Sequence, residues 1–182
     1  MDVAGHGDVR NNDGAVMKVF GLAGWSGSGK TTLVTKLIPA LVGRGLAVST
    51  LKHAHHGFEV DTPGKDSFEH RAAGATEVMV ASARRWALMR DLRGEPEATV
   101  ADLMRRMSPV DLLLVEGFKR EDYEKLEVYR TALGRPLLCH DDPRIVAVAS
   151  DAPLPELDLP RLDLDDVEAI AAFIVGHCGL KG

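Results

Sequence analysis

The sequence predicts an α/β fold in which a mostly parallel β-sheet carries helices on both faces. Short apolar runs alternate with segments whose apolar residues recur at helical spacing, which is the pattern of a layered α/β domain. One junction between a predicted strand and a predicted helix is rich in glycine, as expected where a loop approaches a bound anion. At about 150 residues per domain, the 182 residues of the chain indicate one domain.

Composition excludes several classes of protein. The 27 acidic residues outnumber the 22 Lys and Arg and give a net charge of −5, so we expect no nucleic-acid partner. No apolar run approaches the about 20 residues that span a bilayer, so we expect no membrane association. Cys139 and Cys178 form no CxxC motif, which favours two reduced thiols in a cytoplasmic protein over a zinc or redox site.

The elements follow in order from the N-terminus. Residues 1–15 are polar and glycine-rich, and we expect a disordered tail before a folded domain of residues 16–182. Met17–Ala23 is an apolar run typical of a buried strand, and residues 31–42 show the apolar spacing of a helix. Pro39 lies inside that helix and is expected to remove one backbone hydrogen bond.

The same two patterns assign the rest of the chain. Further strands are expected at residues 46–51, 77–81, 86–90, 111–115, 125–130 and 145–149. Further helices are expected at residues 65–73, at 99–107 with Thr99 as N-cap, and from about Asp165 onward. The proline-rich residues 152–160 are expected to form a surface connection within the domain.

The glycine-rich junction is the segment GWSGSGKT, from Gly24 to Thr31. It matches the pattern G-x-x-x-x-G-K-[ST] at every fixed position and lies between a strand and a helix, as a phosphate-binding loop requires. Lys30 is expected to reach the β- and γ-phosphates, and the Thr31 hydroxyl to bind Mg²⁺. Trp25 lies inside this loop and could contact the nucleotide, and an aromatic side chain that packs or is exposed without specific chemistry is an equal alternative. The motif refines the fold class to a P-loop NTPase-like three-layer sandwich.

The strand at 111–115 has an acidic residue at each end. Asp111 and Glu116 are roughly 16 Å apart along an extended strand, so they cannot bind the same ion. Because ligands bind at the carboxyl ends of parallel strands, we predict Glu116 as the metal-side carboxylate and Asp111 as a cap at the start of the strand. The alternative for Glu116 is a solvated loop acid.

The segment DTPGKDS, residues 61–67, follows the second strand of the predicted domain. A switch segment that closes over the γ-phosphate is expected at this place, with Asp61 as a second metal-side acid and Lys65 contacting phosphate or a partner. The alternative is a Pro63-Gly64 turn in which acidic or hydroxyl side chains cap the next helix.

Basic and histidine residues offer two further candidates. His53, His55 and His56 precede DTPGKDS, and contacts to an anion or a polar surface are favoured over zinc because no cysteine is near. Arg84 and Arg85 fit a solvated turn better than an anion site.

Together these motifs resemble the molybdopterin-guanine dinucleotide biosynthesis adaptor proteins, the MobB family. The resemblance rests on GWSGSGKTT, KHAHHGFEVDTPGKDSFEHRAAGA, LLLVEGFK, KLEVYR and AVASD, and it runs from about Val16 to the C-terminus. It implies a P-loop protein that binds GTP and Mg²⁺, hydrolyses GTP weakly and forms homodimers. It also implies a partner, the molybdopterin guanylyltransferase that joins GMP to molybdopterin.

The resemblance also implies roles for individual residues. Metal binding is implied for Thr31, Asp61 and Glu116, and catalysis for Lys30 and Glu116. Molybdopterin is a candidate ligand of the histidine-bearing loop. Nucleotide binding is implied for Gly24, Trp25, Ser26, Gly27, Ser28, Gly29, Lys30, Thr31 and Thr32.

The chain departs from ordinary GTPases in how it would read guanine. The only asparagines are Asn11 and Asn12, so the N-K-x-D motif is absent. Asp151, in the Ser150-Asp151 pair after the strand at 145–149, is the candidate carboxylate for guanine N1 and N2, with a simple turn as the alternative. The preference for GTP over ATP therefore rests on the resemblance.

Two other functions fit the same sequence. A P-loop small-molecule kinase needs a cationic lid, for which arginines are present, and a paired acid, for which no residue stands out. A nucleotide switch with a purely structural or chaperone-like role needs only nucleotide-dependent binding of a partner.

Overall fold

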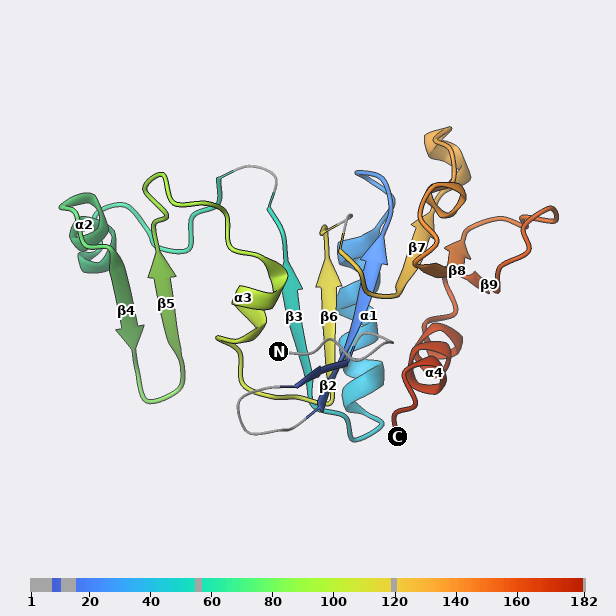
Figure 1. Cartoon of the computed structure of the whole chain (residues 1–182), viewed down its shortest axis with the longest axis horizontal. Coiled ribbons are helices and arrows are strands. Elements are labelled where there is room, and N and C mark those ends of the chain that lie inside the picture. The colour runs from blue at the N-terminus through green and yellow to red at the C-terminus, as the bar shows by residue number, and fades with distance from the viewer. Residues whose placement is uncertain (1–7, 11–15, 55–56, 119–120, 182) are drawn as a thin grey trace. The chain divides into compact units, whose positions relative to one another are not determined.

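The computed structural model describes residues 8–10, 16–54, 57–118 and 121–181, which divide into two compact units. The first unit comprises residues 1–53 and 104–182, and the second comprises residues 54–103 (Figure 1). None of the described residues of the second unit belongs to the main hydrophobic core, and the single domain expected from chain length stays a prediction. Within the described residues no helix has the length and apolar content needed to cross a membrane.

The first unit is built on a sheet with the strand order β3-β6-β2-β7-β8-β9, all parallel. Because β6 is buried on both faces, its sequence is a continuous apolar run rather than an alternating one. β2 lies between β6 and β7, so the loop that leaves its carboxyl end is flanked by the ends of both neighbours. The strands are β2 (Val16–Ala23), β3 (Val48–Lys52), β6 (Leu112–Glu116), β7 (Lys125–Tyr129), β8 (Ile145–Ser150) and β9 (Arg161–Asp163).

Two short strands lie where the sequence predicted none. β1 (Asp8–Arg10) falls inside the predicted disordered tail and pairs antiparallel with the start of β2, Val9 opposite Met17. The rest of that tail, residues 1–7 and 11–15, lies outside the described residues, and its disorder stays a prediction. β9 has three residues, too few to show a periodic pattern, and it pairs with β8 directly after the proline-rich connection.

Two long helices share one core with the sheet. α1 (Lys30–Val42) buries Leu33, Val34, Leu37 and Leu41, while Ile38, which shares their helical spacing, is only partly buried, and Pro39 lies within the helix. α4 (Val167–His177) packs into the same cluster through Ile170 and Ile174. The opposite face at β8 is covered by the 3₁₀ helix η2 (Leu138–His140) and by leucines of residues 154–159, while η1 (Thr131–Leu133) follows β7. The predicted α/β architecture is confirmed.

The second unit holds α2 (Asp66–Ala72) and an antiparallel hairpin of β4 (Glu77–Ala81) and β5 (Trp86–Arg90). Arg84 and Arg85 are exposed in the hairpin turn, as expected. The unit runs into α3 (Val100–Met104), which ends three residues before the predicted Met107. The predicted cap is confirmed, because Thr99 Oγ1 accepts a hydrogen bond from the Asp102 N–H at 3.1 Å.

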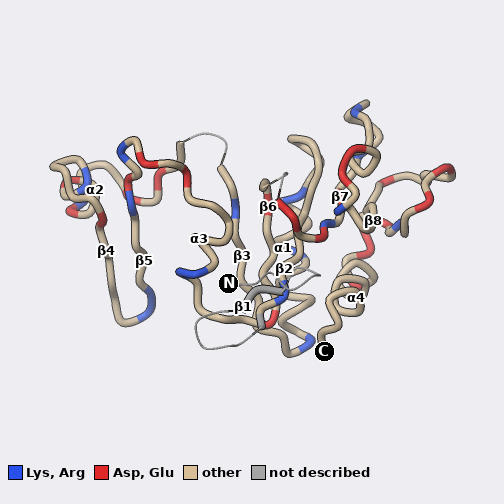
Figure 2. Tube along the Cα trace, viewed as in Figure 1, with Lys and Arg blue, Asp and Glu red and all other residues tan. Residues whose placement is uncertain are grey.

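The charged residues are distributed over both units. Among the described residues, Figure 2 shows Lys and Arg interspersed with Asp and Glu along the trace rather than gathered on one element. The absence of a nucleic-acid partner stays a prediction.

Candidate functional site

The phosphate-binding motif forms the connection between β2 and α1. Gly24 and Gly29 have φ angles of 144° and 98°, which side-chain-bearing residues rarely adopt. A Cβ atom at Gly24 would also lie 2.5 Å from the carbonyl oxygen of Val128. Glycine is therefore required at this position both by conformation and by space. The loop opens onto the N-terminus of α1, where unpaired N–H groups favour an anion.

Lys30 is held against this loop by backbone dipoles. Its Nζ donates to the carbonyl oxygens of Gly24 at 2.8 Å and Trp25 at 3.0 Å. The contacts place a positive charge at the loop, where the sequence predicted it.

Ser28 supplies an independent indication that the loop is built for a ligand. The residue is 1% exposed, and among the described residues its hydroxyl has no hydrogen-bond partner. Leaving a buried hydroxyl unsatisfied costs about 1–3 kcal/mol, so such a group calls for an explanation. A phosphate oxygen bound in the loop would satisfy it.

Thr31 and Glu116 form the centre of the candidate metal site. Thr31, in the first turn of α1, donates its hydroxyl to Glu116 Oε1 at 3.0 Å and to Oε2 at 3.3 Å. Glu116 ends β6 and stands opposite Leu22 of β2 in the sheet register, as expected for an acid at the carboxyl end of the strand. Asp111 lies at the other end of β6 and accepts a hydrogen bond from the Ala47 N–H at 2.8 Å.

The spacing of the two oxygens suits Mg²⁺. Neighbouring ligands in an octahedron with bonds of about 2.0–2.1 Å are about 2.9 Å apart, close to the 3.0 Å measured here. Hydroxyl and carboxylate oxygens are also the ligands that this ion prefers. These two oxygens could therefore serve as ligands of Mg²⁺. Within the described residues no group of three or more His, Cys, Asp and Glu forms an all-protein metal site.

Asp61 belongs to the second unit, where Arg71 binds its carboxylate. Arg71 Nη2 donates to Oδ1 at 3.0 Å and Nε donates to Oδ2 at 3.3 Å. The hydrogen bond from this guanidinium holds the pKa of Asp61 below its ordinary value. Arg71 also pairs with Glu59 at 2.7 Å. The structure thus gives Asp61 an organising contact inside the second unit, and its metal role stays a prediction.

The histidine-bearing loop is only partly described. His53 extends β3, where its N–H donates to Glu116 O at 2.8 Å and its ring lies 4.7 Å from that of Phe118. His55 and His56 lie outside the described residues, so their predicted anion contacts stay untested.

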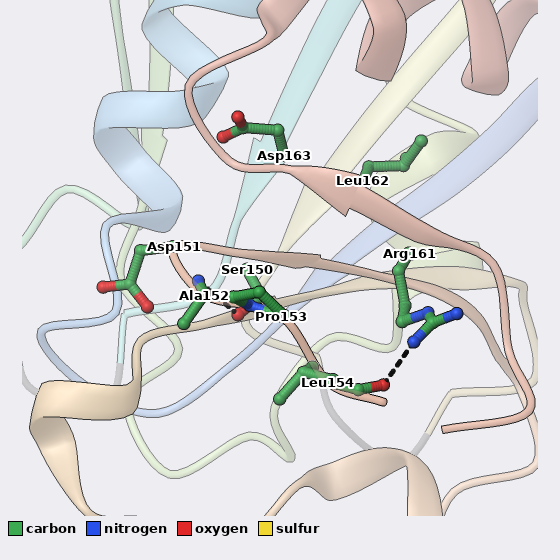
Figure 3. Close-up of a pocket in the computed structure, with 8 residues that line it drawn as sticks. All are labelled: Ser150, Asp151, Ala152, Pro153, Leu154, Arg161, Leu162 and Asp163. Atoms are coloured by element: carbon green, nitrogen blue, oxygen red, sulfur yellow. Dashed lines mark hydrogen bonds between the residues drawn. The ribbon is translucent and has the colours of Figure 1, made fainter. Parts of the chain in front are cut away.

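Asp151 lies at the end of β8 and lines a cavity of about 330 Å³. Figure 3 shows the residues that line this cavity, which come from two segments: the end of β8 with the residues after it, and β9. Asp151 and Asp163 lie toward one side of the view and Arg161 toward the other. Asp151 Oδ1 accepts hydrogen bonds from the backbone N–H and the hydroxyl of Thr131, at 3.1 and 3.2 Å. The backbone hydrogen bond is the main reason why the pKa of Asp151 is lowered. Asp151 therefore organises a turn and lines the cavity at once.

Arg130 connects the phosphate-binding loop to this cavity, and the sequence analysis missed it. Its Nε donates to the carbonyl oxygen of Ser28 at 3.2 Å, and its Nη1 lies 3.5 Å from Asp151 Oδ2. One side chain thus spans the loop and the cavity. The available signal was a cation directly after a parallel strand, at the sheet edge where ligands bind.

Trp25 is anchored rather than free. Its Nε1 donates to the Pro136 carbonyl oxygen at 2.8 Å, and the Arg135 guanidinium lies 5.3 Å from its ring centroid. The segment that carries both residues is fixed by the buried carboxylate of Glu127, which accepts the N–H groups of Leu138 and Cys139 at 2.8 and 2.9 Å. These contacts support the packing alternative for Trp25.

Comparison with known proteins gives concordant matches. The family model described as "Molybdopterin guanine dinucleotide synthesis protein B" matches residues 19–151. A relative from Escherichia coli (strain K12), named "Molybdopterin-guanine dinucleotide biosynthesis adapter protein", is 48% identical over 163 residues, covering 88% of this chain and 93% of the relative. A relative of the same name from Haemophilus influenzae is 41% identical, covering 86% of each chain.

Solved structures agree with these sequence matches. A crystal structure of molybdopterin-guanine biosynthesis protein B is similar with a TM-score of 0.69 and 28% identity, covering 87% of this chain and 98% of the other. The crystal structure of Bacillus subtilis MobB is similar with a TM-score of 0.67 and 25% identity, covering 90% and 98%.

Proposed function

The chain belongs to the molybdopterin guanine dinucleotide synthesis protein B (MobB) family, and from this premise we propose that it is a GTP-binding adaptor in molybdenum cofactor biosynthesis. In this role it assists a partner guanylyltransferase in converting molybdopterin to molybdopterin guanine dinucleotide. The single observation that carries nucleotide binding is the 3.0 Å contact between Thr31, the last residue of the phosphate-binding motif, and Glu116. It joins a phosphate site to a metal site.

The residues of the loop divide the work of binding a triphosphate. Backbone N–H groups of the loop and of the α1 N-terminus surround the phosphate oxygens, and Ser28 gains a partner there. Lys30 exchanges two carbonyl contacts for the more strongly charged β- and γ-phosphates. Thr31 and Glu116 would hold Mg²⁺, which when bound neutralises charge on the phosphates. Catalysis by this set amounts to charge stabilisation by Lys30 and metal positioning by Glu116, in keeping with weak hydrolysis.

The cavity at Asp151 supports guanine as the base. Guanine carries the donors N1–H and N2–H₂ on one edge, where adenine offers an acceptor at N1, so an ionised carboxylate favours guanine. Asp151 is ionised at neutral pH, and the hydrogen bond from the Thr131 N–H, which lowers its pKa, favours this charged form further. Arg130 places the cavity one side chain away from the phosphate-binding loop, as a nucleotide that reaches both requires.

The hairpin of the second unit supports a homodimer. Met79 and Leu88 stand opposite each other in register, and Trp86 lies two residues before Leu88 on the same face. These side chains are 62%, 40% and 66% exposed, so within the described residues this face of the hairpin has an apolar patch that is not covered, next to the ion pair of Glu77 with Arg90. A second copy that covers it is the occupant we propose, in a cytoplasmic protein whose two cysteines are free thiols.

Titration calorimetry with purified chain tests the proposal. We expect binding of GTP in the presence of Mg²⁺ and weaker binding of ATP. In a separate assay, we expect faster formation of molybdopterin guanine dinucleotide when the chain is added to a guanylyltransferase and molybdopterin. If the chain bound neither GTP nor ATP, the proposal that it is a nucleotide-binding protein would be wrong. Transfer of phosphate to a small molecule other than water would favour a P-loop kinase instead.

A further inference from the structure

Lys52 lies beside the candidate metal site formed by Thr31 and Glu116. It is the last residue of β3 and pairs in register with Glu116 of β6. Its Nζ is 3.4 Å from Thr31 Oγ1 and 3.9 Å from Glu116 Oε1. The ammonium group therefore contacts both residues that would hold Mg²⁺.

The backbone at Lys52 is fixed although its side chain is exposed. The next residue, His53, donates its N–H to Glu116 O at 2.8 Å. Gly117 fits closely against the same place, since a Cβ atom there would lie 3.0 Å from His53 O. The Lys52 side chain is 59% exposed and carries four methylene groups, so its ammonium can move from a fixed base.

Stability does not explain this position. An ion pair at 3.9 Å with one partner more than half exposed contributes at most about 1 kcal/mol, and solvent screening reduces that further. The ammonium group of Lys52 should weaken the binding of a divalent cation at Thr31 and Glu116, because two positive charges repel each other. An anion that lies between the two cations reverses the sign of this effect.

We propose that Lys52 binds the terminal phosphate of the nucleotide and thereby distinguishes triphosphate from diphosphate. Mg²⁺ bridges oxygens of the β- and terminal γ-phosphates of a triphosphate, and the charge on the terminal phosphate is the one that a second cation, in addition to Lys30, can neutralise. A diphosphate lacks this group, so Lys52 has no phosphate to bind in that complex. The inference rests on the proposed nucleotide-binding function and adds a residue that reports which nucleotide is bound.

The test measures dissociation constants for a non-hydrolysable GTP analogue and for GDP, both with Mg²⁺. Lys52→Gln should weaken analogue binding about tenfold, the loss of one charge-assisted hydrogen bond, and leave GDP binding within about twofold. Lys52→Arg should restore most of the preference, because it keeps the charge at similar reach. Lys36→Gln, an exposed lysine of α1, is the matched control for loss of one surface charge and should change neither constant.

The outcomes separate this inference from the proposed function. If Lys52→Gln changes both constants equally, or neither, Lys52 does not read the terminal phosphate and the inference is overturned. If the wild-type chain binds neither nucleotide, the proposed function itself fails.

Discussion

The hydroxyl of Thr31 lies 3.0 Å from the carboxylate of Glu116, although 85 residues separate them in the chain. The contact follows from the parallel pairing of β2 with β6, which brings the start of α1 and the end of β6 to the same edge of the sheet. At that edge the candidate phosphate-binding loop meets the two oxygen-bearing side chains of the candidate metal site.

Replacing Glu116 with glutamine should impair Mg²⁺-dependent GTP hydrolysis more than nucleotide binding. The amide keeps the shape but loses the charge that would hold the metal, and loss of one interaction with a charged group, about 1.5–3 kcal/mol, corresponds to roughly 10- to 100-fold in activity. Phosphate release at varied Mg²⁺ concentration measures the effect. Asp111→Asn, at the opposite end of β6, is the control and should leave hydrolysis unchanged in the folded protein. Unchanged turnover in Glu116→Gln would remove Glu116 from the site.

Replacing Lys30 with alanine should abolish measurable triphosphate binding. Two charge-assisted hydrogen bonds to phosphate are worth about 3–6 kcal/mol, which corresponds to at least a hundredfold loss of affinity. Equilibrium dialysis with labelled GTP gives the constant, and Lys36→Ala serves as a control on the exposed face of α1. Retained affinity in Lys30→Ala would mean that the loop does not bind phosphate.

The sequence was sufficient to predict on which elements the candidate residues of the phosphate-binding loop and Glu116 lie, and their roles stay predictions. Strand periodicity placed Glu116 at the carboxyl end of β6, and the glycine pattern placed the loop before α1. Lys52 and Arg130 were missed for one shared reason. Each stands at the end of a parallel strand, and its relevance depends on which strands are neighbours in the sheet, which hydrophobic periodicity does not specify.

The division into two units was not predictable from patterns of burial. Strands β4 and β5 were located correctly, yet most of their side chains are exposed, so their alternation carried no information about which core they join. The second unit is organised largely by arginine networks. Arg71 binds Asp61 and Glu59, and Arg90 binds Glu77 and Glu95. Such pairs have no characteristic spacing in a sequence.

Asp61→Asn separates an organising role from a metal role. The Asp61 pKa is lowered by Arg71, so the pair stabilises the fold above the ordinary value near 3.8 and this contribution is lost as pH falls through the lowered pKa. We therefore expect the wild-type second unit to lose hydrogen-exchange protection below about pH 4, and Asp61→Asn to show reduced protection already at neutral pH. Glu59→Gln, which removes the charge of another carboxylate that pairs with Arg71, is the variant with which Asp61→Asn is compared. Reduced Mg²⁺ affinity without a change in exchange would assign Asp61 to the metal instead.

Asp151→Asn should reduce the preference for GTP over ATP rather than affinity for both. The amide loses the negative charge that favours the guanine N1–H and N2–H₂ donors, and its loss should narrow the affinity ratio about tenfold, the equivalent of one charged hydrogen bond. Because Asp151 also fixes the turn at Thr131, the thermal midpoint is measured in parallel. Thr131→Val disturbs that turn at its hydroxyl without touching the carboxylate charge and controls for structural loosening. An equal loss of GTP and ATP affinity would place the base elsewhere.

Trp86→Ser should shift the chain from dimer to monomer. The indole is 66% exposed on a hairpin face that also carries Met79 and Leu88, and an aromatic at the centre of an interface commonly contributes about 2 kcal/mol or more. Such a loss raises the dissociation constant of the dimer about thirtyfold, which light scattering after gel filtration detects at micromolar concentration. Val42→Ser, at an exposed apolar residue that ends α1, removes apolar surface without touching the hairpin and should leave the mass unchanged. Because the Trp86 side chain is mostly exposed in the single chain, its replacement should leave the fold and the affinity for GTP of the monomeric variant unchanged. A dimer that persists in Trp86→Ser and in the double variant Met79→Ser/Trp86→Ser would show that the two copies meet through another surface.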